Sequence, residues 1–121
     1  MDFLEIWNVK FGELLSDLSA IFGDDGDLSL LRVGFAVAVA ASKEGAWRVF
    51  HDQVVVPYGA RVLARDETFF LESLGGDDLP TGGMDIVARV RVAWKGLSPA
   101  NRLVIWDYFV LLVRLSQRVT I

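Results

Sequence analysis

Residues 4–22 read LEIWNVKFGELLSDLSAIF, and this stretch decides the first element of the fold. Its large apolar residues recur at alternating steps of three and four, which places them on one stripe of an α-helix. Gly23 follows, and a glycine at this position is typical of a helix end. We expect a core-facing helix, with an exposed oligomerisation seam as the alternative. The stripe consists of Leu4, Trp7, Phe11, Leu14, Leu18 and Ile21.

Two later stretches are almost wholly apolar. Residues 28–41 carry only Ser29 and Arg32 as polar side chains, and we expect Asp27 to cap their helix. Residues 103–115 are interrupted only by Asp107 and Arg114, which are seven positions apart and therefore share one polar line. We predict an all-α fold over residues 1–121, a single domain built as a compact bundle of about five to six helices around these two central helices.

The middle of the chain contains several turn and cap signals. Ser42 is expected to cap a third helix, and Pro57 is expected to break or kink it at Val56 because proline lacks an amide hydrogen. Asp66 has the position of a cap for residues 67–71. Residues 75–83 contain four glycines and a proline, which is typical of a loop.

Residues 86–97 admit two interpretations. Ile86, Val90, Ala93 and Leu97 fit a helical stripe, whereas the alternation of apolar and basic residues over 89–94 is typical of a strand. No hairpin signal or partner strand lies nearby, so we predict a helix. Ser98 and Pro99 then supply a cap and a first helical residue for the last helix.

The composition excludes several classes of protein. Hydrophobic residues make up 53% of the chain and the mean hydropathy is +0.40, yet the longest low-charge run, residues 28–42, is shorter than the ~20 residues of a membrane span. No basic segment opens the chain as in a secretory signal, and there is no cysteine for disulfides or thiolate metal sites. We expect a soluble intracellular protein whose apolar excess is covered by its own fold and by a partner.

Charge is distributed unevenly along the chain. Residues 1–31 carry seven acids and one base, whereas residues 86–121 carry six bases and one acid. Either the two ends pack close together or are separately solvated, or complementary patches match neighbouring copies. The pI of about 4.8 and the dilution of the C-terminal arginines by apolar residues argue against nucleic-acid binding.

No pattern of residues points to catalysis or to a cofactor. His51 stands beside Asp52, and adjacent helical residues point in different directions, so this is not a ready acid–base pair. Residues 24–27 lack the ligand spacing of a calcium loop, and no phosphate-binding glycine motif is present. We predict no enzyme activity, no catalytic residue, no metal and no cofactor.

The aromatic residues are the candidates for a protein interface. Tryptophan and tyrosine often anchor protein contacts, although residues on a core stripe default to the core. The candidates are Trp7, Phe11, Trp47, Trp106 and Tyr108.

Two segments together resemble a protein family. Residues 55–71 read VVPYGARVLARDETFFL and residues 94–108 read WKGLSPANRLVIWDY. An acid pair, a double phenylalanine, a loop and then the W-x-x-L-S-x-x-N-R-x-x-I-W-x-Y pattern resemble small helical proteins of large DNA viruses that infect algae and protists. The resemblance covers roughly residues 50–115, implies no known activity, and implies a component of a virion or virus factory.

Two hypotheses for function follow. The first is a non-enzymatic structural or protein-interaction domain that self-associates or forms part of a larger assembly. The second is a helical domain that binds a small molecule or lipid in an apolar cavity.

Overall fold

The computed structural model describes residues 2–23, 26–71 and 85–119, and within these ranges the chain is all-α with no strand. The predicted all-α bundle is therefore confirmed. The predicted loop over residues 75–83 lies outside the described residues. The elements are α1 (Phe3–Phe22), α2 (Gly26–Ala41), α3 (Gly45–Phe50), the π-helix η1 (His51–Val55), α4 (Val56–Leu63), α5 (Thr68–Leu71), α6 (Asp85–Ala93), the 3-10 helix η2 (Trp94–Gly96) and α7 (Pro99–Ser116).

Helix α1 forms where the apolar stripe predicts it. Asp2 caps it, because its carboxylate accepts a hydrogen bond from the Glu5 amide at 3.1 Å. The helix ends at Gly23, whose φ of +72° is readily adopted only by glycine. The stripe faces the core: Trp7, Phe11, Leu14, Leu15 and Leu18 are buried.

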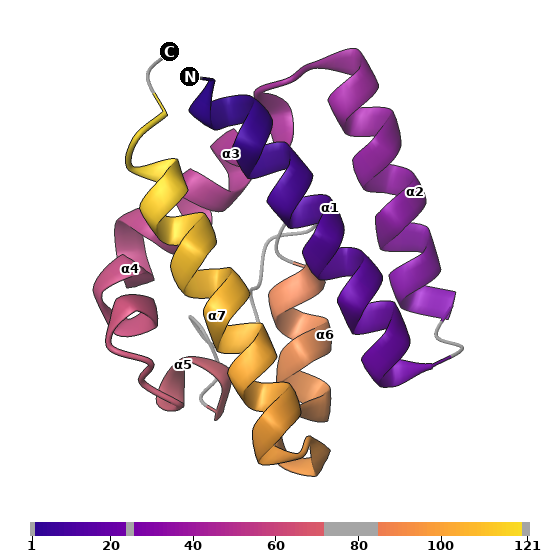
Figure 1. The fold of residues 1–121 in the computed structure, drawn as a ribbon, viewed down its shortest axis with the longest axis vertical. Helices are drawn as coiled ribbons and strands as arrows, with labels where there is room; N and C mark the ends of the chain where they lie inside the picture. Colours follow the sequence, from indigo (N-terminus) through magenta and orange to yellow (C-terminus); the bar gives the residue numbers. More distant parts are fainter. Residues whose placement is uncertain (1, 24–25, 72–84, 120–121) are drawn as a thin grey trace.

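Helix α7 contributes more buried side chains than any other described helix. Ser98 caps it by accepting a hydrogen bond from the Asn101 amide at 3.2 Å, and Pro99 occupies its first turn, as predicted. It packs against α1, α4 and η1, and α1 and α7 run side by side in opposite directions (Figure 1). Asp107 and Arg114 are exposed, which places the predicted polar line on the outer surface. Seven side chains of α7 are buried: Ile105, Trp106, Phe109, Val110, Leu112, Val113 and Ser116.

Helix α2 occupies a different place from the central one that we expected. It lies at one side of the bundle (Figure 1), and only its inner side, through Leu28, Leu31 and Phe35, packs on the core cluster. The physical reason is size. Large aromatic side chains of α1, α5 and α7 fill the core and bury far more area than the alanines of α2. We also expected Asp27 to cap this helix. The helix begins at Gly26, so residue 27 lies in its first turn and not at the capping position before it.

Helices α3, η1 and α4 follow one another without a break. We expected Ser42 to cap this run, but α3 begins at Gly45 and no side chain caps it. We also expected a break or a kink at Val56 and Pro57. The chain stays helical there, with the π-helix η1 directly before α4 and Pro57 in the first turn of α4. Pro57 cannot donate a backbone hydrogen bond, which interrupts the regular bonding pattern of the helix. The helix widens into a π turn before it, in which the Val56 amide bonds to the His51 carbonyl, five residues back.

A cluster of aromatic rings joins α5, η2 and α7. The Phe70 ring stacks on Trp94 with centroids 4.4 Å apart, and it meets Phe109 edge-on at 5.2 Å. Phe70, Trp94 and Phe109 are fully buried. Residues 85–96 are helical, which confirms the helix predicted for residues 86–94.

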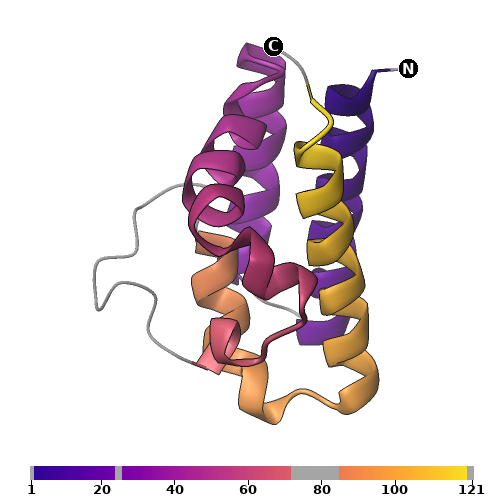
Figure 2. The same ribbon diagram turned by 90° about the vertical axis from the view of Figure 1, so that its left-hand side faces the viewer.

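The first and the last helix meet at one end of the bundle. The first turn of α1 and the last turn of α7 lie at the same end of the molecule (Figure 2). The Arg118 guanidinium lies over the Phe3 ring, 5.6 Å from its centroid, and Arg89 lies over Phe22 at 4.6 Å. Two basic residues of the C-terminal third thus lie against aromatic rings of the N-terminal helix within one chain.

Candidate functional site

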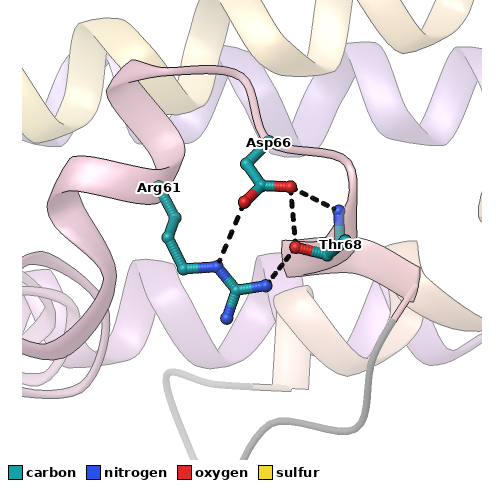
Figure 3. Close-up of polar contacts among 3 residues, drawn as sticks. All are labelled: Arg61, Asp66 and Thr68. Carbon is teal, nitrogen blue, oxygen red and sulfur yellow. Dashed lines mark hydrogen bonds and ion pairs between the residues drawn. The ribbon is translucent and has the colours of Figure 1, made fainter.

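The turn between α4 and α5 contains a polar network (Figure 3). The Asp66 carboxylate accepts hydrogen bonds from the Thr68 amide at 3.0 Å and from the Thr68 hydroxyl at 2.7 Å. Arg61 donates a hydrogen bond to the Thr68 hydroxyl oxygen, and its Nε lies 3.6 Å from the other Asp66 oxygen. Asp66 therefore caps α5, as its position in the sequence predicted.

The residue before this cap has an uncommon backbone conformation. Arg65 has a φ of +53° and closes the end of α4, because the amide of Arg65 bonds to the Val62 carbonyl and the amide of Asp66 bonds to the Arg61 carbonyl. Its guanidinium reaches Asp107 on α7 at 2.6 Å. A non-glycine residue here costs of order 1 kcal/mol, so the ion pair with α7 offsets a local strain.

These contacts hold the turn in place, and we call them the α4–α5 clamp; it comprises Arg61, Asp66 and Thr68 with the pairs Arg65–Asp107 and Glu67–Arg102. Hydrogen bonds from the Thr68 hydroxyl and amide, with the charge of Arg61, lower the pKa of Asp66. The carboxylate is therefore ionised well below neutral pH and is unsuited to general acid–base work. A second pair, Arg102 with Glu67 at 3.7 Å, ties the same turn to the start of α7. The clamp places Phe69 and Phe70 in the core.

A second polar contact joins α1 to α7. The Tyr108 hydroxyl donates a hydrogen bond to the Asp17 carboxylate, with 2.5 Å between the oxygens. Burial raises the pKa of Tyr108 to about 12, and the hydrogen bond and the negative charges of Asp17 and Glu13 add to the shift. The phenol therefore stays protonated and serves as a donor throughout the ordinary pH range.

His51 lies beside Asp52 and against a tryptophan ring. His51 Nδ1 lies 3.4 Å from Asp52 Oδ1, so the two side chains approach more closely than the sequence argument expected, at a distance longer than an ordinary hydrogen bond. The imidazole also lies against the Trp47 ring, with centroids 5.1 Å apart. Over the described residues no three histidine, aspartate or glutamate side chains gather as metal ligands would.

The structure places four of the five predicted interface residues in the chain's own core. Trp7, Phe11, Trp47 and Trp106 are buried, and they pack against other core side chains. Tyr108 is half-buried and is engaged with Asp17. The large aromatic residues therefore hold the monomer together, since they bury the most area per residue.

A row of exposed apolar side chains lies on α2. Leu30, Val33 and Val37 are 72%, 63% and 64% exposed, and their spacing of three and four puts them on one face of the helix. Small side chains fill the rest of this face, and the exposed Arg32 lies beyond its edge, next to Ser29 and Ala36. We call it the α2 outer face; its exposed residues are Ser29, Leu30, Val33, Gly34, Ala36, Val37, Ala40 and Ala41.

A shallow groove lies along the first turns of α1. Its volume is about 390 Å³, and it is lined by Asp2, Glu5, Ile6, Val9 and Lys10. The groove opens to solvent and has charged residues at its edges. It is thus a surface depression and not an enclosed apolar cavity.

Comparisons of this chain with known proteins do not assign it to a family. No protein-family model, no curated protein and no solved structure matches this chain. None of the helices in the described ranges combines the length and the apolar character needed to cross a membrane.

Proposed function

We propose that this chain is a non-enzymatic interaction domain, part of a larger protein assembly, and that the α2 outer face is its contact surface. A surface helix of a soluble protein ordinarily presents charged or polar residues to water. The α2 outer face presents one serine and seven apolar or small residues. A contiguous apolar surface of this kind is typical of a site that a partner covers.

The other parts of the molecule favour this reading over the alternatives. The buried residues of α1 and α7 are used within the core, whereas Leu30, Val33 and Val37 form an exposed apolar row on α2. The other exposed large apolar residues among the described ones are spread over α1, α4, α6 and α7: Val9, Val56, Leu63, Val92, Leu103 and Leu111. The second hypothesis, binding of a small molecule or lipid in a cavity, gains no support from the open groove on α1. A place in a virus rests on the resemblance over residues 50–115 alone.

The test compares two surface variants in extracts of cells that produce the chain. Val33→Asp puts a charge in the centre of the α2 outer face, whereas Val92→Asp puts one on α6, where Val92 is 82% exposed. Chemical cross-linking in the cells before lysis keeps weak contacts from dissociating on dilution, and we expect the cross-linked wild type and Val92→Asp to elute from a sizing column in the same larger species. Val33→Asp is expected to elute as the free chain, with unchanged circular dichroism. Equal elution of all three proteins would contradict the proposal.

A further inference from the structure

We infer that the occupant of the α2 outer face is a second copy of this chain, with the two α2 helices packed antiparallel about a two-fold axis beside position 35. This inference rests on the proposed function and names its partner. It is carried by the order of large and small residues along α2, by the absence of charge on that face, and by Gly34.

The order of residues on α2 is complementary to itself when it is reversed. In an antiparallel pair centred at position 35, opposite residues have numbers that sum to 70. Leu30 then faces Ala40, so a large side chain meets a small one, as in ridges-into-grooves packing. Val33 faces Val37, and this apolar pair occurs on both sides of the axis. The remaining pairs at equal height, Ser29 with Ala41 and Gly34 with Ala36, lie toward opposite edges of the face and border the contact without meeting across it.

Charge also permits a symmetric contact here. In a two-fold contact the same surface occurs on both sides, so a charged patch would meet its own charge and be repelled. The α2 outer face has no ionised side chain at any of its eight positions. An antiparallel arrangement in addition aligns the two helix dipoles favourably.

Gly34 supplies an independent observation. A glycine in the middle of a helix weakens it relative to alanine, so such a position usually has a packing reason. Apart from the adjoining backbone of α2, no heavy atom of the described residues lies within 4 Å of where a Cβ would stand at Gly34, and its φ is not positive. The described part of the chain therefore gives no packing reason for this glycine. Close approach of a second helix would give one.

The size of the face predicts a weak dimer. Sixteen residues at 1.5 Å each make α2 about 24 Å long, and a helix is about 10 Å wide, so one face offers about 240 Å² of contact per copy. A standard stable interface covers about 800 Å² per partner. We therefore expect a dissociation constant of about 1 μM to 1 mM, with dimers visible by sedimentation only in concentrated solution.

Single cysteines test the register cleanly, because the chain contains none. At a helix separation of 8–10 Å, the Cα atoms of opposite residues 33 and 37 would lie about 4–5 Å apart, within disulfide range. Two copies of residue 33 would lie about 7–8 Å apart, beyond it. We expect that mixing Val33→Cys with Val37→Cys gives mainly the mixed disulfide. Val92→Cys is the matched control and should form none above background.

The outcomes separate this inference from the proposed function. Sedimentation of the wild type should show a dimer that Val33→Asp weakens at least about tenfold, because burying a carboxylate is unfavourable. A chain that stays monomeric at millimolar concentration overturns the second copy as partner. If that monomer still elutes in a large, Val33-dependent species from extracts, the proposed function stands with a different partner. A homodisulfide of Val33→Cys that exceeds the mixed product overturns the antiparallel register.

Discussion

Replacing Tyr108 with phenylalanine removes the one hydroxyl that α7 donates to Asp17 of α1, and it leaves the ring in place. A hydrogen bond to a charged acceptor contributes about 1.5–3 kcal/mol when buried. The contact lies near the surface, so solvent screening reduces its contribution to about 1 kcal/mol. We expect Tyr108→Phe to lower the free energy of unfolding by this amount at neutral pH.

The effect should depend on pH in a defined direction. The pKa of Tyr108 is raised to about 12 in the folded chain, whereas an unfolded tyrosine titrates near the ordinary value of 10. A raised pKa means that the folded state holds the proton more tightly. The stabilisation is therefore fully present below pH 10 and is lost as the pH rises toward about 12.

Urea unfolding of the wild type and Tyr108→Phe at pH 7, 9, 10 and 11 measures this difference, since other titrating groups cancel between the two proteins. The gap in unfolding free energy should be constant up to pH 9 and shrink above pH 10. Asp17→Asn, alone and combined with Tyr108→Phe, completes a double-mutant cycle and should account for most of the gap. A gap that does not change with pH, or a coupling energy near zero, would refute the reasoning.

Three further perturbations have expected outcomes. Phe70→Ala empties the centre of the ring cluster and should cost about 3–5 kcal/mol in urea unfolding, whereas a cost below about 1.5 kcal/mol would show that the cluster collapses around the gap. Gly34→Ala should stabilise the dilute monomer by about 0.5–1 kcal/mol in thermal unfolding, because the Cβ meets nothing; a loss of stability would contradict that open position. Asp66→Asn should speed hydrogen exchange at the amides of Phe69 and Phe70. Because the pKa of Asp66 is lowered, its stabilisation is lost as the pH falls below 3.8, so the wild type should lose its advantage there; an advantage that persists in acid would count against the cap.

The helices that could be predicted from the sequence are those with a local signal. The 3-4 spacing over residues 4–21, and the Ser98–Pro99 start of the last helix, depend only on neighbours along the chain. The cap at Asp66 is equally local, since its hydrogen bonds reach only two residues ahead. These three signals predict the local secondary structure of their own segments, and each of the three predictions is confirmed.

The position of each helix in the bundle could not be predicted in the same way. Residues 28–41 and 103–115 look equally apolar, yet α7 buries seven side chains, whereas among the described residues of α2 only Leu28 is buried. Side-chain volume decided between them, and the comparison requires all partners at once. For the same reason the tryptophans looked like interface anchors, whereas three-dimensional packing assigns them to the core.

The contacts of the clamp were also beyond prediction. Arg65 and Asp107 are 42 residues apart in the sequence, and no pattern pairs them. The positive φ of Arg65 could not be predicted from the sequence either, because glycine is the residue that usually signals this conformation.

The pairing of α1 with α7 has a consequence for biosynthesis. Residues 23–98 separate the two helices, so a ribosome adding 5–20 residues per second completes α1 roughly 4–15 s before α7 begins to appear. During that interval the nascent chain carries the unburied stripe of α1 beside the uncharged face of α2. Since non-local contacts form late, we expect the packing of α7 against α1 to be the slow folding step. Neighbouring nascent chains on one polysome should therefore be most prone to associate just before this step.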